Sequence, residues 1–261
     1  MALWIDEQDG GDIWIYDIVR DSFSRLTIEG SNRIPFWSPD GQWVVFASIR
    51  DGEPGLYRER ADFSGPAERL LARETRQPGD WSTDGKLLVF VVNHPTTQND
   101  IWVLPLEGDG EPRPFVQTPF YDALPALSPD GQWLAYQSDD AGEVQVYVQR
   151  FPEGGRRWQI STDGGNGPVW SPDGRELFFN GADVLLAVQM ATEPELTVGT
   201  PRVLFEETRK EGVGFSIDVA PDGQRFMMIW GDEEAGRLAG RRLSVVLNWF
   251  EELKARVPTG K

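Results

Sequence analysis

Cysteine is absent from this chain, and histidine occurs only once, as His94. Without cysteine there are no disulfides, no thiolate metal sites and no cysteine nucleophile. A single histidine also excludes metal sites that need two imidazole ligands. A hydrolase of the Ser-His-Asp type would need His94 beside an activated serine, and no Gly-x-Ser-x-Gly elbow occurs in the sequence. We therefore interpret His94 as a solvated loop residue.

Basic residues are also scarce. The chain has 25 basic against 42 acidic residues, which gives a formal net charge of −17 at pH 7. This charge repels phosphate backbones and anionic membranes, so we expect no nucleic-acid partner and no direct membrane insertion. We interpret the charge as a solubility feature rather than as the mark of a specific cationic ligand.

Long apolar runs are missing as well. No run approaches the roughly 18 residues of a membrane span, and the first residues lack the basic and apolar regions of a signal peptide. We therefore expect the chain to be cytoplasmic as written, and extracytoplasmic if it belongs to a membrane-anchored parent.

One turn motif is repeated along the chain. Its five copies are Ser38-Pro39-Asp40-Gly41, Ser82-Thr83-Asp84-Gly85, Ser128-Pro129-Asp130-Gly131, Ser171-Pro172-Asp173-Gly174 and Ala220-Pro221-Asp222-Gly223. The aspartates are 44, 46, 43 and 49 residues apart. Proline presets φ for a type I turn, aspartate bonds the neighbouring backbone, and glycine accepts positive φ. The motif therefore predicts a tight hairpin connection once in every repeat.

Strand-like segments surround each turn. An apolar run leads into it, and a run rich in β-branched and aromatic residues leads out, followed by two further strand-like segments. Four strands in a repeat of roughly 40 to 50 residues are typical of a propeller blade. We predict an all-β propeller of six blades with up to four antiparallel strands each, the first and last incomplete. Five blades, with the incomplete ones merged, is the alternative.

The predicted blades span about 1–30, 31–72, 73–118, 119–163, 164–207 and 211–249, in a single domain of residues 1–261. Because Met1 directly precedes a strand-like run, no residues remain for the innermost strand of the first blade. Either the C-terminal segment closes the ring, or the chain is part of something longer. An unpaired inner edge would also allow oligomers by edge-strand pairing.

The C-terminal segment predicts a short helix at about 249–257. Asn248 and Glu251 have the spacing of a capping box, and Trp249, Leu253 and Val257 share one helix side. We interpret this helix as a latch on the propeller rim, with a handle for another protein as the alternative.

The repeated Trp-Ser-Pro-Asp-Gly turn and the Asp-Ile-Trp third strand resemble the TolB-type β-propeller repeat of bacteria. Three stretches, 143–152, 158–165 and 246–253, are similar to the propeller region that follows the kinase domain and membrane span of receptor-like bacterial serine/threonine kinases. This chain has no kinase domain, phosphate loop or membrane span. The resemblance therefore implies a sensing or docking module without kinase activity. Thr83 in place of proline and Ala220 in place of serine depart from the turn pattern.

Carboxylates are abundant, but none forms a recognisable catalytic set. Adjacent acids such as Asp139 and Asp140 are usually solvated, and no spacing singles out one pair for sugar chemistry. The turn aspartates recur in every repeat, which indicates turn closure. Asp6, Asp9 and Asp12 alternate as in an oxygen-ligand loop, but the later glycine and glutamate positions of such a loop are not matched. We predict no catalytic residue, metal or cofactor, with calcium as the alternative.

The two faces of the predicted propeller differ. The five turns make one face uniform, while the links between blades vary around the other mouth of the central channel. Loops on a rigid scaffold commonly carry recognition, so we predict that this mouth binds a protein, a peptide or a small polar ligand. The candidate contacts are Arg33, Gln77, Tyr121, Asp122, Asn166 and Phe215.

The leading hypothesis is a non-catalytic protein-interaction or ligand-sensing propeller, as a fragment or sensor module of a larger signalling protein. The alternative is a hydrolase or lyase that acts on polysaccharide or peptide at the channel mouth.

Overall fold

A computed structural model describes residues 1–7, 10–72, 77–108, 110–192, 195–206, 216–220, 222–223 and 225–229. Every regular element within these ranges is a β-strand. In this part of the chain, no helix is long and apolar enough to cross a membrane. The helix predicted at about 249–257 lies outside the described residues.

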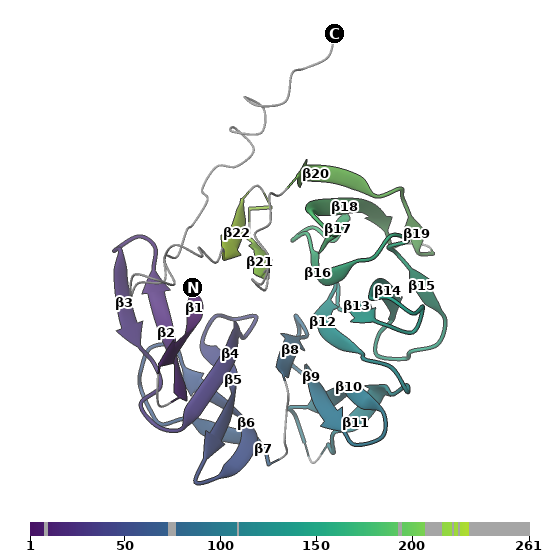
Figure 1. Cartoon of the computed structure of the whole chain (residues 1–261). Helices are drawn as coiled ribbons and strands as arrows, with labels where there is room; N and C mark the ends of the chain where they lie inside the picture. The colour runs from purple at the N-terminus through teal and green to yellow at the C-terminus, as the bar shows by residue number, and fades with distance from the viewer. Residues whose placement is uncertain are drawn as a thin grey trace.

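The strands form six antiparallel sheets in the described ranges, which follow one another around a ring (Figure 1). The first sheet holds β1 (Ala2–Glu7), β2 (Gly10–Asp17) and β3 (Ser22–Arg25). The second holds β4 (Ser31–Trp37), β5 (Trp43–Arg50), β6 (Glu53–Arg60) and β7 (Glu68–Leu71). The third holds β8 (Gln77–Trp81), β9 (Leu87–His94), β10 (Gln98–Pro105) and β11 (Arg113–Val116).

The fourth sheet holds β12 (Ala123–Leu127), β13 (Trp133–Ser138), β14 (Gln145–Arg150) and β15 (Arg157–Gln159). The fifth holds β16 (Asn166–Trp170), β17 (Glu176–Asn180), β18 (Val184–Ala191), β19 (Thr197–Val198) and β20 (Arg202–Glu206), and the sixth holds β21 (Ser216–Val219) and β22 (Phe226–Ile229).

This arrangement confirms the prediction of an all-β propeller. The first and last sheets share no strand in the described part of the chain, as expected for six blades rather than five. That residues 1–261 form one domain stays a prediction. In the described sheets, β4, β8, β12, β16 and β21 lie toward the centre of the ring, and each contacts the next (Figure 1).

The core lies between neighbouring sheets. The second strand of four sheets carries an aromatic residue at the same position, and all four are buried: Phe46, Phe90, Tyr136 and Phe179. Burial of such a side chain contributes about 1.5–3 kcal/mol. Because both faces of these strands are covered, the runs after the turns read as continuous apolar segments rather than as alternating ones.

An irregularity shared by several inner strands was not predicted. The register of β4 and β12 shifts against the second strand of each sheet. Ile34 and Leu124, six residues before the turn aspartates, have φ values of 53° and 50°, and Gly167 takes the same place in β16 with φ 60°. A β-bulge therefore bends each of these strands at the same point. In β4 and β12 the bulge holds a non-glycine residue in the left-handed backbone conformation, which is unfavourable for such residues.

Side-chain hydrogen bonds close the turns. Ser128 Oγ donates to Asp130 Oδ1 at 2.5 Å and accepts from the backbone N–H of Trp133 at 2.9 Å. Asp130 Oδ1 also accepts from the backbone N–H of Gln132 at 3.0 Å, and Gly131 has φ 69°. The same set of bonds occurs in the turns that begin at residues 38, 82 and 171.

Removing the turn hydroxyl should destabilise the fold. Ser128→Ala leaves the Trp133 N–H without its acceptor in a buried turn, so we expect the free energy of unfolding to fall by about 1–2 kcal/mol. Ala220→Ser supplies the missing hydroxyl to the last turn and should raise the free energy of unfolding by up to about 1 kcal/mol. Urea unfolding of both variants measures this. An unchanged midpoint for Ser128→Ala would show that the hydroxyl contributes nothing.

A carboxylate joins the inner strands of the third and fourth sheets. Asp80 Oδ2 accepts from the backbone N–H of Leu127 in β12 at 2.7 Å, and Oδ1 accepts from the N–H of Trp81 at 2.7 Å. Burial raises the pKa of Asp80 to about 6, with Asp218 on β21 adding to the shift and the two backbone hydrogen bonds opposing it. Ionisation of this residue therefore works against folding.

The pH dependence of stability tests this effect. In the unfolded chain Asp80 has the ordinary aspartate pKa of 3.8, and in the folded chain its pKa is about 6. The folded state thus binds more protons between these values, so this residue's contribution to stability falls as pH rises through them, by at most about 3 kcal/mol. We expect the stability of Asp80→Asn, relative to the parent chain, to rise between about pH 4 and 6.5 and then level off. A difference that stays constant across this range would contradict the assignment.

Candidate functional site

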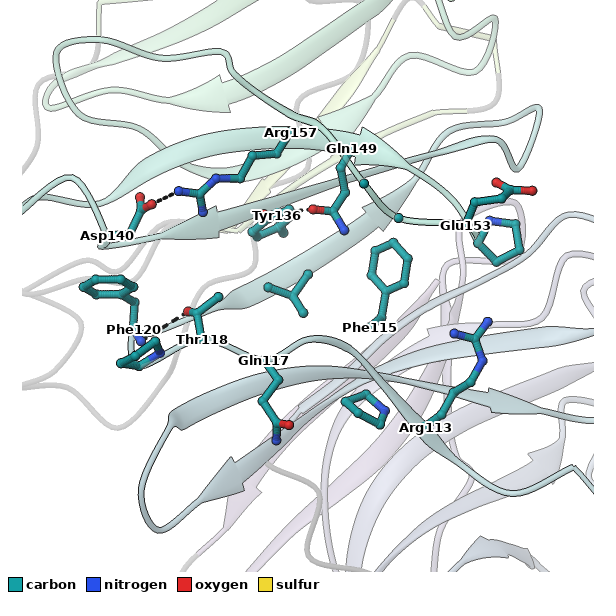
Figure 2. A pocket seen from close by; sticks show the side chains of 16 residues that line it. Arg113, Phe115, Gln117, Thr118, Phe120, Tyr136, Asp140, Gln149, Glu153 and Arg157 are labelled. Carbon is teal, nitrogen blue, oxygen red and sulfur yellow. Dashed lines mark hydrogen bonds and ion pairs between the residues drawn. The ribbon is translucent and has the colours of Figure 1, made fainter.

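A groove opens between the third and fourth sheets, on their outer side (Figure 2). Its volume is about 640 Å³. We call it the rim groove, and it is lined by residues 113–120 of the third sheet and by Tyr136, Asp140, Gln149, residues 152–155 and Arg157 of the fourth. One wall is therefore β11 with the link that follows it, and the other comes from β13, β14, β15 and the turn between the last two.

Aromatic rings are present along the rim groove. Phe115 packs edge-on against Phe151, with ring centroids 5.2 Å apart. Phe120 is 39% exposed, although it is a large apolar residue. Tyr136 is fully buried beneath these rings and its hydroxyl donates to Gln149 Oε1 at 3.3 Å. Burial raises the pKa of Tyr136 to about 12, so its hydroxyl remains a donor at neutral pH.

Charged side chains lie at both ends. Arg157 forms an ion pair with Asp140, and its guanidinium carbon lies 4.6 Å from the ring centroid of Tyr147. The Tyr147 hydroxyl donates to Asp140 Oδ1 at 2.5 Å. At the opposite end Arg113 and Glu153 face solvent (Figure 2). The described residues give these two no ion-pair partner. At one end of the groove the charged side chains are thus paired with each other, and at the other end Arg113 and Glu153 are available to a ligand.

Buried carboxylates hold the wall of the groove in place. Gln117 Nε2 donates to Asp100 Oδ2 at 2.8 Å, and Thr118 Oγ1 donates to Asp122 Oδ2 at 2.6 Å. The backbone N–H of Phe120 in turn donates to Thr118 Oγ1 at 3.2 Å. Both aspartates are fully buried. The conformation of the link 117–120 therefore depends on two carboxylates that do not themselves line the groove.

The lining of the rim groove offers groups that are suited to recognition. Its lining provides aromatic faces, two guanidinium groups, amides and one threonine hydroxyl that is already bonded to Asp122. The carboxylates of Asp140 and Glu153 lie at opposite ends (Figure 2). Among the residues that the structure describes, no group of three or more histidine, aspartate or glutamate side chains could hold a metal ion.

The predicted mouth residues lie at the beginnings of successive inner strands. Arg33 is in β4, Gln77 begins β8, Tyr121 and Asp122 directly precede β12, and Asn166 begins β16. Phe215 lies outside the described residues. In the described part of the chain no hydrogen bond joins any two of the side chains of Arg33, Tyr121, Asp122 and Asn166. The side chain of Asp122 is buried between sheets. Their role as a ligand site stays a prediction.

Sequence reasoning missed the rim groove, because its walls come from two repeats. The available signals were two adjacent aromatic residues in a link, Phe120 and Tyr121, and an arginine two residues after a Gly-Gly pair, Arg157. His94, interpreted as a solvated loop residue, ends β9 and is partly buried, with Nδ1 3.1 Å from Thr96 Oγ1.

The comparisons with family models, relatives and solved structures all find TolB-type propellers. The model of the TolB beta propeller domain matches residues 77–248. The protein Atu1656 of Agrobacterium fabrum is 33% identical over 156 residues, which are 55% of this chain and 52% of that protein. The Tol-Pal system protein TolB of Anaeromyxobacter dehalogenans (strain 2CP-C) is 35% identical over 92 residues, 35% of this chain and 20% of that protein.

Among solved structures, TolB from Acinetobacter baumannii superposes with a TM-score of 0.68 at 16% identity, covering 86% of this chain and 56% of that one. This likeness shows the fold. The chain thus spans about half the length of Atu1656 and a fifth of the Anaeromyxobacter TolB. The narrower resemblance to the propeller region of receptor-like kinases stays a prediction. Because the family model covers most of the sequence, the chain belongs to the TolB β-propeller family.

Proposed function

We propose that this propeller is a non-catalytic protein-interaction module that binds an extended segment of a partner protein in the rim groove. The observation that carries the proposal is the combination of an exposed aromatic ring, Phe120, with charged side chains that lack partners among the described residues, Arg113 and Glu153. Exposed apolar rings beside unpaired charges are typical of surfaces that become covered on binding.

The dimensions of the groove favour a peptide. About 640 Å³ lies within the roughly 300–1,000 Å³ of most ligand sites. The groove follows β11 from the link at Phe120 to the turn at Glu153 (Figure 2). A long, open site of this kind fits a stretch of chain better than a compact small molecule.

The lining residues indicate what that segment carries. Phe115 and Phe120 offer faces for an apolar or aromatic anchor, the residue type that dominates binding at hot spots. The guanidinium of Arg113 is free to form a bidentate bond with a carboxylate. On a chain with net charge −17, this end of the groove is where an acidic side chain of the partner is accommodated.

Relatives named as Tol-Pal system proteins support a protein as the partner. We further propose that the chain serves as a sensing module of a larger protein and is extracytoplasmic if that parent is anchored in a membrane. The mouth residues Arg33 and Tyr121 form a second contact region in this proposal. Tyr121 directly follows Phe120, so one bound segment could extend from the groove to the mouth.

Peptide selection tests the proposal. Peptides selected from a random library on the immobilised chain should lose affinity for the variant Phe120→Ala/Arg113→Ala by about tenfold or more, because an apolar anchor and a charged contact at the two ends of the groove are removed together. Phe63→Ala/Arg20→Ala is the matched control, since Phe63 is 48% exposed and Arg20 is exposed on another sheet. Fluorescence polarisation measures the affinities.

Two results would contradict the rim groove as the site. Loss of binding in Arg33→Ala/Tyr121→Ala with unchanged binding in the groove variant would place the site at the channel mouth. Turnover of pooled peptide or oligosaccharide substrates that is lost in Asp140→Asn would favour the hydrolase or lyase alternative.

A further inference from the structure

A buried polar cluster joins the first and second sheets. Thr27 Oγ1 donates to Asp12 Oδ1 at 2.8 Å, and the amide of Asn32 donates to the same oxygen at 3.3 Å. Ser48 Oγ donates to Asn32 Oδ1 at 2.8 Å. All four side chains are buried. The amide of Asn32 thus bridges an aspartate on one side, as donor, and a serine on the other, as acceptor.

The repeat places the same positions between the third and fourth sheets. Asp100 stands in an Asp-Ile-Trp segment like that of Asp12, and Ser138 is five residues after the start of its second strand, as Ser48 is. Asp122, like Asn32, is eight residues before the aspartate of its turn. The backbone agrees, because Ile34 and Leu124, two residues further on, share the left-handed conformation.

The two clusters differ in two respects. Asp12 forms an ion pair with Arg25, whereas Asp100 accepts from Gln117, and an amide in the first cluster is replaced by a carboxyl in the second. Asp122 has a carboxyl where Asn32 has an amide, and an ionised carboxylate has no hydrogen to donate. Asp122 Oδ1, Asp100 Oδ1 and Ser138 Oγ have no hydrogen-bond partner among the described residues, and all three side chains are fully buried. A buried polar atom without a partner is costly, and two buried carboxylates with free oxygens are more so.

We infer that Asp122 is protonated in the folded chain and donates its proton to Asp100 Oδ1, as the Asn32 amide does to Asp12, so that one proton holds the wall of the rim groove in place. Asp100 is the acceptor because its Oδ2 already receives hydrogen bonds from Thr97 Oγ1 and Gln117 Nε2, at 2.9 and 2.8 Å, whereas its Oδ1 has no hydrogen-bond partner among the described residues. The consequence for binding rests on the proposed function of the groove.

The groups around Asp122 are consistent with this assignment. Burial raises the pKa of Asp122, and the negative charge of Asp100 on β10 adds to the shift. Thr118, Ser138 on β13 and Arg157 on β15 act in the opposite direction. The remaining neighbours with titratable groups are Tyr136, Tyr147, Asp139 and Asp140; Asp139 Oδ1 accepts from the Tyr121 N–H, and Asp140 pairs with Arg157.

Loss of the proton reaches the groove through bonds already described. Gln117 is bonded to Asp100, Thr118 to Asp122, and Phe120 to Thr118. With both carboxylates ionised, like charges would repel in a junction that excludes water. The link 117–120 would then lose its fixed conformation, and Phe120 its position as an anchor.

Asp122→Asn is the decisive variant, because it restores the amide that Asn32 has at the equivalent position. In the parent chain the stability contributed by Asp122 is present at low pH and is lost as pH rises through its folded pKa. We therefore expect the stability of Asp122→Asn, relative to the parent chain, to increase as pH rises from the ordinary aspartate pKa of 3.8 through the raised folded pKa of Asp122, and then to level off. Infrared difference spectra of the parent minus the variant, recorded between the ordinary aspartate pKa and the pH at which the stability difference levels off, should show the carbonyl band of a protonated carboxylic acid. Absence of that band, or a variant less stable at every pH, would overturn the inference.

Binding supplies the second measurement. Affinity of the parent chain for a groove-selected peptide should weaken over the same pH range on the order of fivefold or more, and that of Asp122→Asn should stay constant. Asn32→Asp is the matched control, because it creates a carboxyl pair away from the groove and should leave the pH dependence of binding unchanged. If the infrared band is present but the affinity does not change with pH, Asp122 is protonated as inferred, and the proposed effect of this proton on the groove is wrong. If added calcium or sodium raises the stability of the parent chain but not that of Asp122→Asn, a bound cation rather than a proton lies between the two carboxylates, and the inference is wrong.

Discussion

Each sheet of this propeller can bury its two faces only against its neighbours, and contact between adjacent sheets is the constraint on which the rest of the structure depends. The largest core cluster shows this, because Trp133, Ala135 and Val148 of the fourth sheet pack with Leu177 and other residues of the fifth. A single sheet exposes too much apolar surface to be stable alone. Where two neighbouring sheets separate, side chains that would otherwise be covered therefore become accessible.

The rim groove is such a position. Toward the centre of the ring the third and fourth sheets are in contact and share the cluster around Tyr136, and toward the outside their surfaces separate between Phe115 and Arg157. The exposed ring of Phe120 and the unpartnered charge of Arg113 lie where packing between sheets no longer requires apolar contact. In the proposed function, recognition therefore takes place where the packing between two sheets is interrupted.

The polar clusters between sheets also occur at equivalent positions of the repeat but differ in their residues. Asp12 forms an ion pair with Arg25 and accepts from Thr27 and Asn32. At the equivalent junction Asp100 accepts from Gln117, and Asp122 has an acid where Asn32 has an amide. A repeat fold permits such a replacement because each junction is stabilised by its own neighbours. One junction can therefore become sensitive to protons while the others keep their structure.

The sequence by itself determined the turns, the four-strand repeat and the propeller, because these follow from contacts within a few residues. Ser128, Asp130 and Trp133 close one turn within six positions, and the same spacing recurs along the chain. The bulge at Leu124 was not predicted, since an ordinary side chain in a left-handed conformation leaves no compositional sign. Only the tertiary structure decided which side chains of different repeats meet. Asp80 meets the backbone of Leu127, and Phe115 meets Phe151, because ring packing brings separate strands into contact, and no local pattern encodes those contacts.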